Sequence, residues 1–141
     1  MPEWSTKIKP SVQSALIADP TINYVIPIYD SMSQFVIPAI TITNKKDSVK
    51  IATFNGTPFV IDAVQKGQVE MDVGESLGWI ARSILDGYMR NMCGLKTYNE
   101  LYVPFYIFDS SNAKNAGTPA DYDRGYGDQH VAGYEKLWML K

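Results

Sequence analysis

The sequence predicts an α/β fold in which helices flank a parallel sheet. Short runs rich in β-branched and aromatic residues alternate with longer segments in which apolar residues recur every three or four positions. Segments of this length can act as crossovers between parallel strands, and such crossovers are right-handed. With 141 residues, the chain suits one domain with a sizeable core.

Composition excludes several classes of partner. The net charge is −2 and acidic and basic residues are interspersed, so no basic stripe would attract nucleic acid or an anionic membrane. No apolar run reaches the roughly 20 residues of a membrane-spanning helix. The first residues lack the basic and apolar regions of a signal peptide.

Cys93 is the only cysteine of the sequence, and we interpret it as a small buried side chain near a helix end.

The first strand of the predicted sheet follows an initial helix. Apolar positions over residues 3–18 have helical spacing. The nearly continuous apolar run over 22–29 predicts a strand buried on both faces, although Pro27 indicates a bulge or a strand edge. Asp30 is a candidate N-cap for the helix that comes next.

The second strand and its helix have the clearest signals in the chain. Residues 49–54 predict a strand, and an Asn-Gly turn follows at Asn55. Thr57 is a candidate N-cap, and Pro58 occupies the first position of the next helix. That helix should end at Gly67, which is suited to the residue after a helix C-cap.

The remaining elements are spaced less regularly. Residues 68–73 predict a short strand, and residues 77–93 predict the longest helix, which has a wide apolar face. Residues 101–108 predict another strand, 109–127 a loop without periodicity, and 133–140 a short final helix. A loop of that length is usually functional or packs on something absent.

Motifs for catalysis, metal binding and cofactors are absent from the sequence. His130 has no cysteine cluster or nucleophile elbow to work with, so we expect no metal site and no catalytic triad. No glycine-rich phosphate loop follows a strand, and we expect no cofactor. Glu70 and Asp72 share one face of a predicted strand, where solvated carboxylates are favoured over a general acid–base pair. We therefore expect a binding lobe and not an enzyme.

Polar side chains follow the ends of three predicted strands. Tyr29 and Asp30 follow the first strand, Asn55 follows the second, and Glu75 follows the third. Ligands of open α/β sheets bind outside the carboxyl ends of the strands, which lie along one edge when the strands are parallel. Amide and carboxylate groups can bond vicinal hydroxyls, and an aromatic ring can stack on a sugar. We expect a neutral sugar or polyol there, with Asn55 at the centre. The alternative is that these residues cap the helices, which is strongest for Asp30.

Three stretches resemble the carboxyl-terminal lobe of the type I periplasmic sugar-binding proteins, the substrate receptors of bacterial ABC transporters. They are Tyr29-Asp30-Ser31-Met32, Phe54-Asn55-Gly56-Thr57-Pro58 and Asp62-Ala63-Val64-Gln65-Lys66-Gly67. The effector domain of the lac repressor family shares this fold. The resemblance implies that Tyr29 stands where the family often has a ligand-binding Asn, Asn55 where it usually has an Asp, and Glu75 where it often has a Gln. It implies a sugar pocket and leaves the particular sugar open.

The resemblance also implies partners for a longer parent protein. Such receptors have two lobes, so residues 1–108 would be a partial carboxyl-terminal lobe and 109–141 an extension toward a missing amino-terminal lobe. The expected partners are a sugar or polyol, the ABC transporter permease and that lobe, and the parent would be periplasmic or an extracytoplasmic lipoprotein. The uncovered sheet edge also makes a homodimer plausible. The alternative function is the effector-binding core of a lac-repressor-family transcription regulator.

Overall fold

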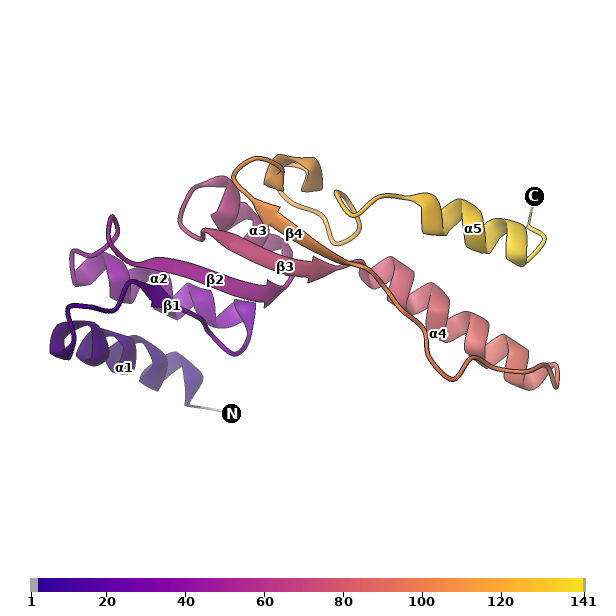
Figure 1. The fold of residues 1–141 in the computed structure, drawn as a ribbon, viewed down its shortest axis with the longest axis horizontal. Helices are drawn as coiled ribbons and strands as arrows, with labels where there is room; N and C mark the ends of the chain where they lie inside the picture. Colours follow the sequence, from indigo (N-terminus) through magenta and orange to yellow (C-terminus); the bar gives the residue numbers. More distant parts are fainter. Residues whose placement is uncertain (1–2, 141) are drawn as a thin grey trace.

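The computed structural model describes residues 3–140, and it confirms the α/β class, with helices beside a mostly parallel sheet (Figure 1). The elements, in chain order, are α1 (Trp4–Ala18), β1 (Tyr24–Val25), the 3-10 turn η1 (Asp30–Met32), α2 (Ser33–Ile42), β2 (Lys50–Asn55), α3 (Pro58–Gln65), β3 (Met71–Glu75), α4 (Leu77–Met92), β4 (Phe105–Asp109), the 3-10 turn η2 (Ala113–Ala116) and α5 (Gln129–Leu137).

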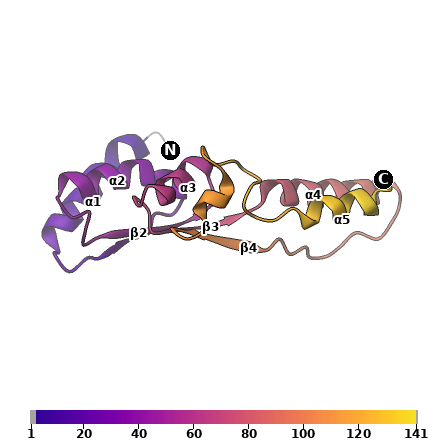
Figure 2. The same ribbon diagram turned by 90° about the horizontal axis from the view of Figure 1, so that it is seen from above.

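The sheet has the strand order β1-β2-β3-β4, in which β2 pairs in parallel with both β1 and β3. Strand β4 instead runs antiparallel to β3, which differs from the parallel sheet expected. The reason lies in α4, which starts at the carboxyl end of β3 and points away from the sheet (Figures 1 and 2). The chain returns from the far end of α4 and therefore enters the sheet at the edge where β3 leaves it.

One face of the sheet is covered and the other is open. Helices α1, α2 and α3 lie on the same side of the strands (Figure 2). Along β2, Ile51 and Thr53 are buried, whereas Phe54 on the opposite face is 44% exposed. The strands, the helices and the tail all contribute to the buried apolar cluster, and its members include Leu16, Val36, Ile40, Ile51, Val60, Ile61, Val64, Phe108 and Tyr126.

The prediction of a first strand buried on both faces over 22–29 is wrong. Only Tyr24–Val25 pair as β1, and they do so at the edge of the sheet. Tyr24 is half exposed, and Ile26 and Ile28 are 68% and 69% exposed. Pro27 lacks the N–H group that a longer strand would use, which agrees with its interpretation as a mark of a strand edge.

Strand β3 spans Met71–Glu75 and so begins and ends later than the predicted range 68–73. The amide of Gln68 donates to the carbonyl of Ala63 at 2.9 Å, so this part of the chain still belongs to the turn that ends α3. Gly67 in that turn has a φ of 69°, which confirms its predicted place after the helix.

The wide apolar face predicted for α4 is exposed over much of the helix. Ile84, Tyr88 and Met92 are 68%, 61% and 69% exposed. The buried residues of this helix are instead the polar Ser83 and Asp86. Hydrophobic spacing identified the helix correctly but could not show which side of it another part of the chain covers.

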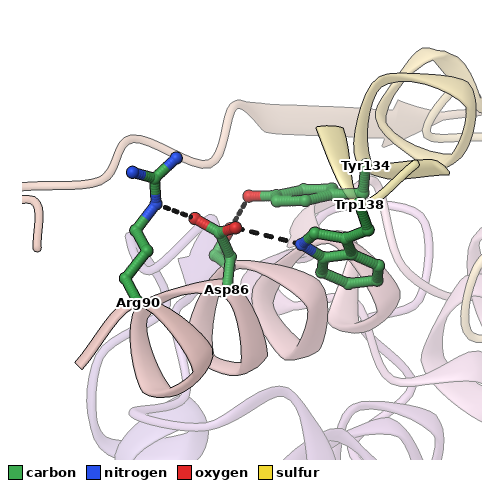
Figure 3. A network of polar contacts seen from close by, with 5 residues as sticks. Asp86, Arg90, Tyr134 and Trp138 are labelled. Atoms are coloured by element: carbon green, nitrogen blue, oxygen red, sulfur yellow. Dashed lines mark hydrogen bonds and ion pairs between the residues drawn. The ribbon is translucent and has the colours of Figure 1, made fainter. Parts of the chain in front are cut away.

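Helix α5 packs against the polar side of α4 through a network of hydrogen bonds (Figure 3). The Asp86 carboxylate accepts from Arg90 Nε at 2.7 Å and from Trp138 Nε1 at 3.0 Å. The Ser83 and Tyr134 hydroxyls lie 2.8 Å apart and share a hydrogen bond. This network explains why polar residues are the buried ones on α4.

The long loop after β4 packs on α3. The Gln65 side-chain amide donates to the carbonyls of Ala113 and Gly117, at 3.1 and 2.8 Å, and the Ala120 amide donates to the Asp62 carboxylate at 2.9 Å. The loop also contains the short η2 turn. The loop is therefore ordered although its sequence has no periodicity, because side chains of α3 form hydrogen bonds with its backbone groups.

Helix ends agree only in part with the sequence. Gly94 has a φ of 68° and ends α4 as predicted, but Cys93 at the C-cap is exposed, so its interpretation as a buried residue is wrong. The last helix spans Gln129–Leu137 and not 133–140, and Gly133 lies inside it. Among residues 3–140, no helix combines the length and apolar character needed to cross a membrane.

Candidate functional site

The carboxyl ends of the parallel strands meet at one edge of the sheet, as expected. Asn55 at the end of β2 is the register partner of Gly74, and Glu75 ends β3 directly after it. The Asp30 carboxylate, beyond the end of β1, reaches the backbone of Thr57. The structure therefore brings Asp30, Asn55 and Glu75 to the same edge, and Tyr29 precedes Asp30 in the chain.

Strand β2 ends in a turn with an unusual backbone. Asn55 has a φ of 139° and Gly56 a φ of 76°, in a region that L side chains rarely adopt. Glycine enters this region without steric cost, whereas the φ of Asn55 lies well beyond the left-handed helical values that Asn tolerates. Thr57 then takes the N-cap position of α3 and Pro58 its first position, as predicted, although the Thr57 side chain makes no capping hydrogen bond.

Asp30 supports this turn from η1, the 3-10 turn that follows β1 in the chain. Its side chain is only 2% exposed, and its carboxylate accepts from the Thr57 amide at 2.7 Å. The partial positive charge of a helix N-terminus favours a carboxylate in this position. Asp30 thus caps α3, whereas the sequence had suggested a cap for the helix that follows Asp30 directly.

Asp72 holds the same turn from the other side. It is fully buried, and its carboxylate accepts from the Gly56 amide at 3.1 Å. Burial and the nearby charge of Asp30 raise the pKa of Asp72 to about 7, with the Gly56 hydrogen bond acting in the opposite direction. The prediction of two solvated carboxylates is therefore wrong for Asp72. Glu70 does lie at the surface, where it pairs with Lys50 at 3.2 Å.

Tyr126 of the carboxyl-terminal loop closes the turn over two glycines. Its hydroxyl donates to the Gly56 carbonyl at 3.4 Å, and a Cβ on Gly56 or Gly74 would lie 2.2 or 2.5 Å from that hydroxyl oxygen. Burial and the charge of Asp72 raise the pKa of Tyr126. Sequence reasoning gave Tyr126 no role, and the pair of glycines at two strand ends was the available signal of a close approach.

Tyr29 and Glu75 are more accessible than the buried aspartates. Tyr29 is 41% exposed, and its ring stacks on that of Trp4 with centroids 5.5 Å apart. Within residues 3–140, the Glu75 side chain has no hydrogen-bond or ion-pair partner. Glu75 also lines an open cavity of about 470 Å³ together with Tyr102 and Phe105. The edge thus offers an amide, a carboxylate and aromatic rings to a ligand.

The side chain of His130 is buried against an aromatic ring. It is 5% exposed in α5, and its ring stacks on Trp79 with centroids 5.0 Å apart. Burial lowers the pKa of His130, as does the nearby charge of Arg82. Among residues 3–140, no group of His, Cys, Asp and Glu side chains is arranged to hold a metal ion.

Comparison with solved structures connects this geometry to known proteins, although neither a family model nor a curated protein sequence matches the chain. One similar structure is an ABC transporter periplasmic solute-binding protein from Actinobacillus succinogenes with bound D-allose, with a TM-score of 0.72, 18% identity, and coverage of 76% of this chain and 38% of that one. The chain has part of the type I periplasmic binding protein fold.

Two further solute-binding proteins of ABC transporters share this fold. One, from Bacillus halodurans with bound myo-inositol, has a TM-score of 0.69 and 17% identity over 79% of this chain and 38% of its own. Another, from Agrobacterium vitis with bound D-fucose, has a TM-score of 0.69 and 14% identity over 81% of this chain and 40% of its own. The chain thus spans about two fifths of each structure.

Proposed function

We propose that the chain is part of a substrate-binding protein that delivers a sugar or polyol to an ABC transporter. The observation that carries this proposal is the meeting of Asn55 and Glu75 at the carboxyl edge of the parallel strands, which is where open α/β sheets bind ligands. The D-allose, myo-inositol and D-fucose bound to structures of the same fold support the ligand class.

The residues at the edge divide into contact and support roles. The Asn55 amide can donate and accept hydrogen bonds with neighbouring hydroxyls, and the Glu75 carboxylate can accept them. The half-exposed ring of Tyr29 offers a flat apolar surface for a sugar face. The Asp30 carboxylate is already bonded to the Thr57 amide and acts by supporting the turn from beneath.

The exposed face of α4 supports the proposal that a second lobe completes the site. Ile84, Tyr88 and Met92 present apolar surface that no segment of residues 3–140 covers. The similar structures are about twice as long as this chain, which leaves ample length for an amino-terminal lobe. The parent protein would then act in the periplasm and present its ligand to the permease.

One lobe alone should bind its ligand weakly. Hydrogen bonds from one side leave half of the sugar in water, and no closure of a second lobe expels that water. We expect dissociation constants in roughly the millimolar range for the isolated chain. Micromolar affinity in titration calorimetry for any pentose, hexose or inositol would contradict this expectation.

An NMR titration tests the site directly. D-allose, D-fucose and myo-inositol are added separately to the labelled chain, and the backbone and side-chain amides are followed. We expect shifts at Asn55 and Glu75 that Asn55→Ala abolishes and that Glu70→Gln, a matched change at an exposed carboxylate, leaves in place. Absence of shifts at this edge with all three ligands would overturn the proposed site.

Sedimentation velocity over a concentration series tests whether a second lobe or a second copy of the chain packs on the exposed face of α4. A monomer at all concentrations supports the second lobe as the cover. A dimer that Tyr88→Lys dissociates would show that another copy of the chain takes its place, because a charge at the centre of an apolar contact is costly to bury.

A further inference from the structure

The turn that carries Asn55 is held almost entirely by side chains from distant parts of the chain. The Gly56 amide is bonded to Asp72 and the Thr57 amide to Asp30, while Tyr126 covers Gly56. These three side chains come from β3, η1 and the loop before α5. Because Asn55 has a positive φ that most residues avoid, the turn needs such support to persist.

Asp72 is the member of this group with unmet hydrogen-bonding capacity. One of its carboxylate oxygens accepts from Gly56, and the other is buried without a partner within residues 3–140. Its register partner Thr53 also has a buried hydroxyl that lacks a partner. Because the buried Asp72 carboxylate has only one hydrogen-bond donor, a change in its charge should change how strongly it holds the Gly56 amide.

We infer that Asp72 and Tyr126 are positioning residues for ligand binding, and that the charge of the Asp72 carboxyl adjusts the turn on which Asn55 sits. This inference rests on the proposed function for the role of Asn55, but not for the behaviour of the turn. An ionised carboxylate holds an amide about twice as strongly as a neutral carbonyl does. The turn is thus held tightly when Asp72 is ionised and more loosely when it is protonated.

The surroundings place this change of charge near neutral pH. Burial and repulsion from Asp30 raise the pKa of Asp72 to about 7. The charged groups that act on the covering Tyr126 ring are all acidic, namely Asp72, Asp30, Asp123 and Glu75. The edge therefore becomes both more negative and more rigid as the pH rises through 7.

The first experiment follows the turn without any ligand. Amide spectra of the chain and of Asp72→Asn are recorded from about pH 5 to pH 9. We expect the Gly56 amide proton to titrate in the unchanged chain with a midpoint near 7 and to stay constant in Asp72→Asn. Glu70→Gln, the control at a nearby exposed carboxylate, should leave the titration as it is. A Gly56 amide that does not titrate, or that still titrates in Asp72→Asn, would overturn the role of Asp72.

The second experiment uses D-allose as the probe and reads the shift of the Asn55 side-chain amide. Asp72→Asn should bind with an affinity that no longer depends on pH, whereas Asp72→Ala should bind about tenfold more weakly or worse because the Gly56 amide is left unpaired. Tyr126→Ala removes the ring that covers both glycines and should weaken binding.

The outcomes distinguish the two proposals. If the Gly56 titration depends on Asp72 but D-allose shifts no resonance at Asn55, the positioning of the turn is upheld and the sugar-binding proposal fails for this probe. If D-allose binds equally to Asp72→Ala, Tyr126→Ala and the unchanged chain, sugar binding is upheld and the positioning inference is overturned.

Discussion

The molecule has a sheet half, made of the strands with α1, α2 and α3, and a projecting half, made of α4 and α5. Both halves bury aspartate carboxyls, and Asp72 of the first and Asp86 of the second have opposite surroundings. In the sheet half, Asp72 faces the like charge of Asp30, and burial with this repulsion raises its pKa to about 7. In the projecting half, burial alone would raise the pKa of Asp86, but hydrogen bonds from Arg90 and Trp138 lower it. Ionisation of Asp72 strengthens its one hydrogen bond to Gly56 but lowers the stability of the folded chain, because the charge is buried beside Asp30. Ionisation of Asp86 stabilises the folded chain, because Arg90 and Trp138 donate to its carboxylate.

The two halves also differ in what holds them together. The sheet half has a buried apolar cluster between α1, α2, α3 and the strands. The projecting half, in which α4 and α5 extend away from the sheet (Figure 1), buries Ser83, Asp86 and His130, while the apolar side of α4 stays exposed. The sheet half therefore has a hydrophobic core of its own. The projecting half instead exposes apolar residues of α4, as surfaces that bind another part of a protein do.

The largest expected effect tests the difference in packing. Ile61→Ala removes a fully buried side chain from the sheet half and should lower the free energy of unfolding by about 3 kcal/mol, through lost burial and a cavity. The matched change Ile84→Ala on α4 should alter it by less than about 0.5 kcal/mol, because that side chain is 68% exposed. Urea denaturation at equal protein concentration measures both. Equal losses would show that the exposed face of α4 is covered in solution.

The next effect concerns the pH dependence that Asp72 imposes. Because its folded-state pKa of about 7 lies above the value of 3.8 for a free side chain, the folded state keeps its proton longer, and stability should fall as the pH rises through this window. Asp72→Asn removes that loss, so the variant should be more stable than the unchanged chain at pH 8 by on the order of 2 kcal/mol. At pH 4 the two should be nearly equal. Thermal unfolding at both pH values tests the prediction, and a variant less stable at pH 8 would contradict it.

The smallest effect is the local one at Asp86, where the same substitution should act in the opposite direction. Its lowered folded-state pKa means that its stabilisation is present above the ordinary value of 3.8 and is lost as the pH falls below it. Asp86→Asn weakens the hydrogen bonds from Arg90 and Trp138 and should cost about 1 kcal/mol at pH 7. Hydrogen exchange should then quicken in α5 while the amides of β2 and α3 keep their protection. Uniform acceleration across the chain would show that the halves unfold together.

Local sequence signals predicted the middle of the chain well. The strand at 49–54, the Asn-Gly turn and the helix that starts at Pro58 and is closed by Gly67 all depend on short-range preferences. These are β-branched residues, glycine at positive φ and proline in a first helical turn. The helix at 77–93 was found for the same reason. The predicted gathering of Asn55 and Glu75 at one edge followed from parallel strand order alone.

Tertiary structure decided what each polar group does. Asp72, Asp30 and Tyr126 meet around Gly56 from segments far apart in sequence, and no spacing rule links a carboxylate to an amide in another element. The antiparallel entry of β4 follows from the direction of α4, which local preferences do not set.

By itself, then, the sequence determined the strand at 49–54, the turn after it and the helices that start at Pro58 and Leu77, because those choices rest on residues within a few positions of one another. It also determined that polar side chains end the parallel strands. Only the tertiary structure decided which faces are covered and which carboxyls are buried, because burial depends on contacts between distant segments. The exposed side of α4 and the raised pKa of Asp72 both have that origin.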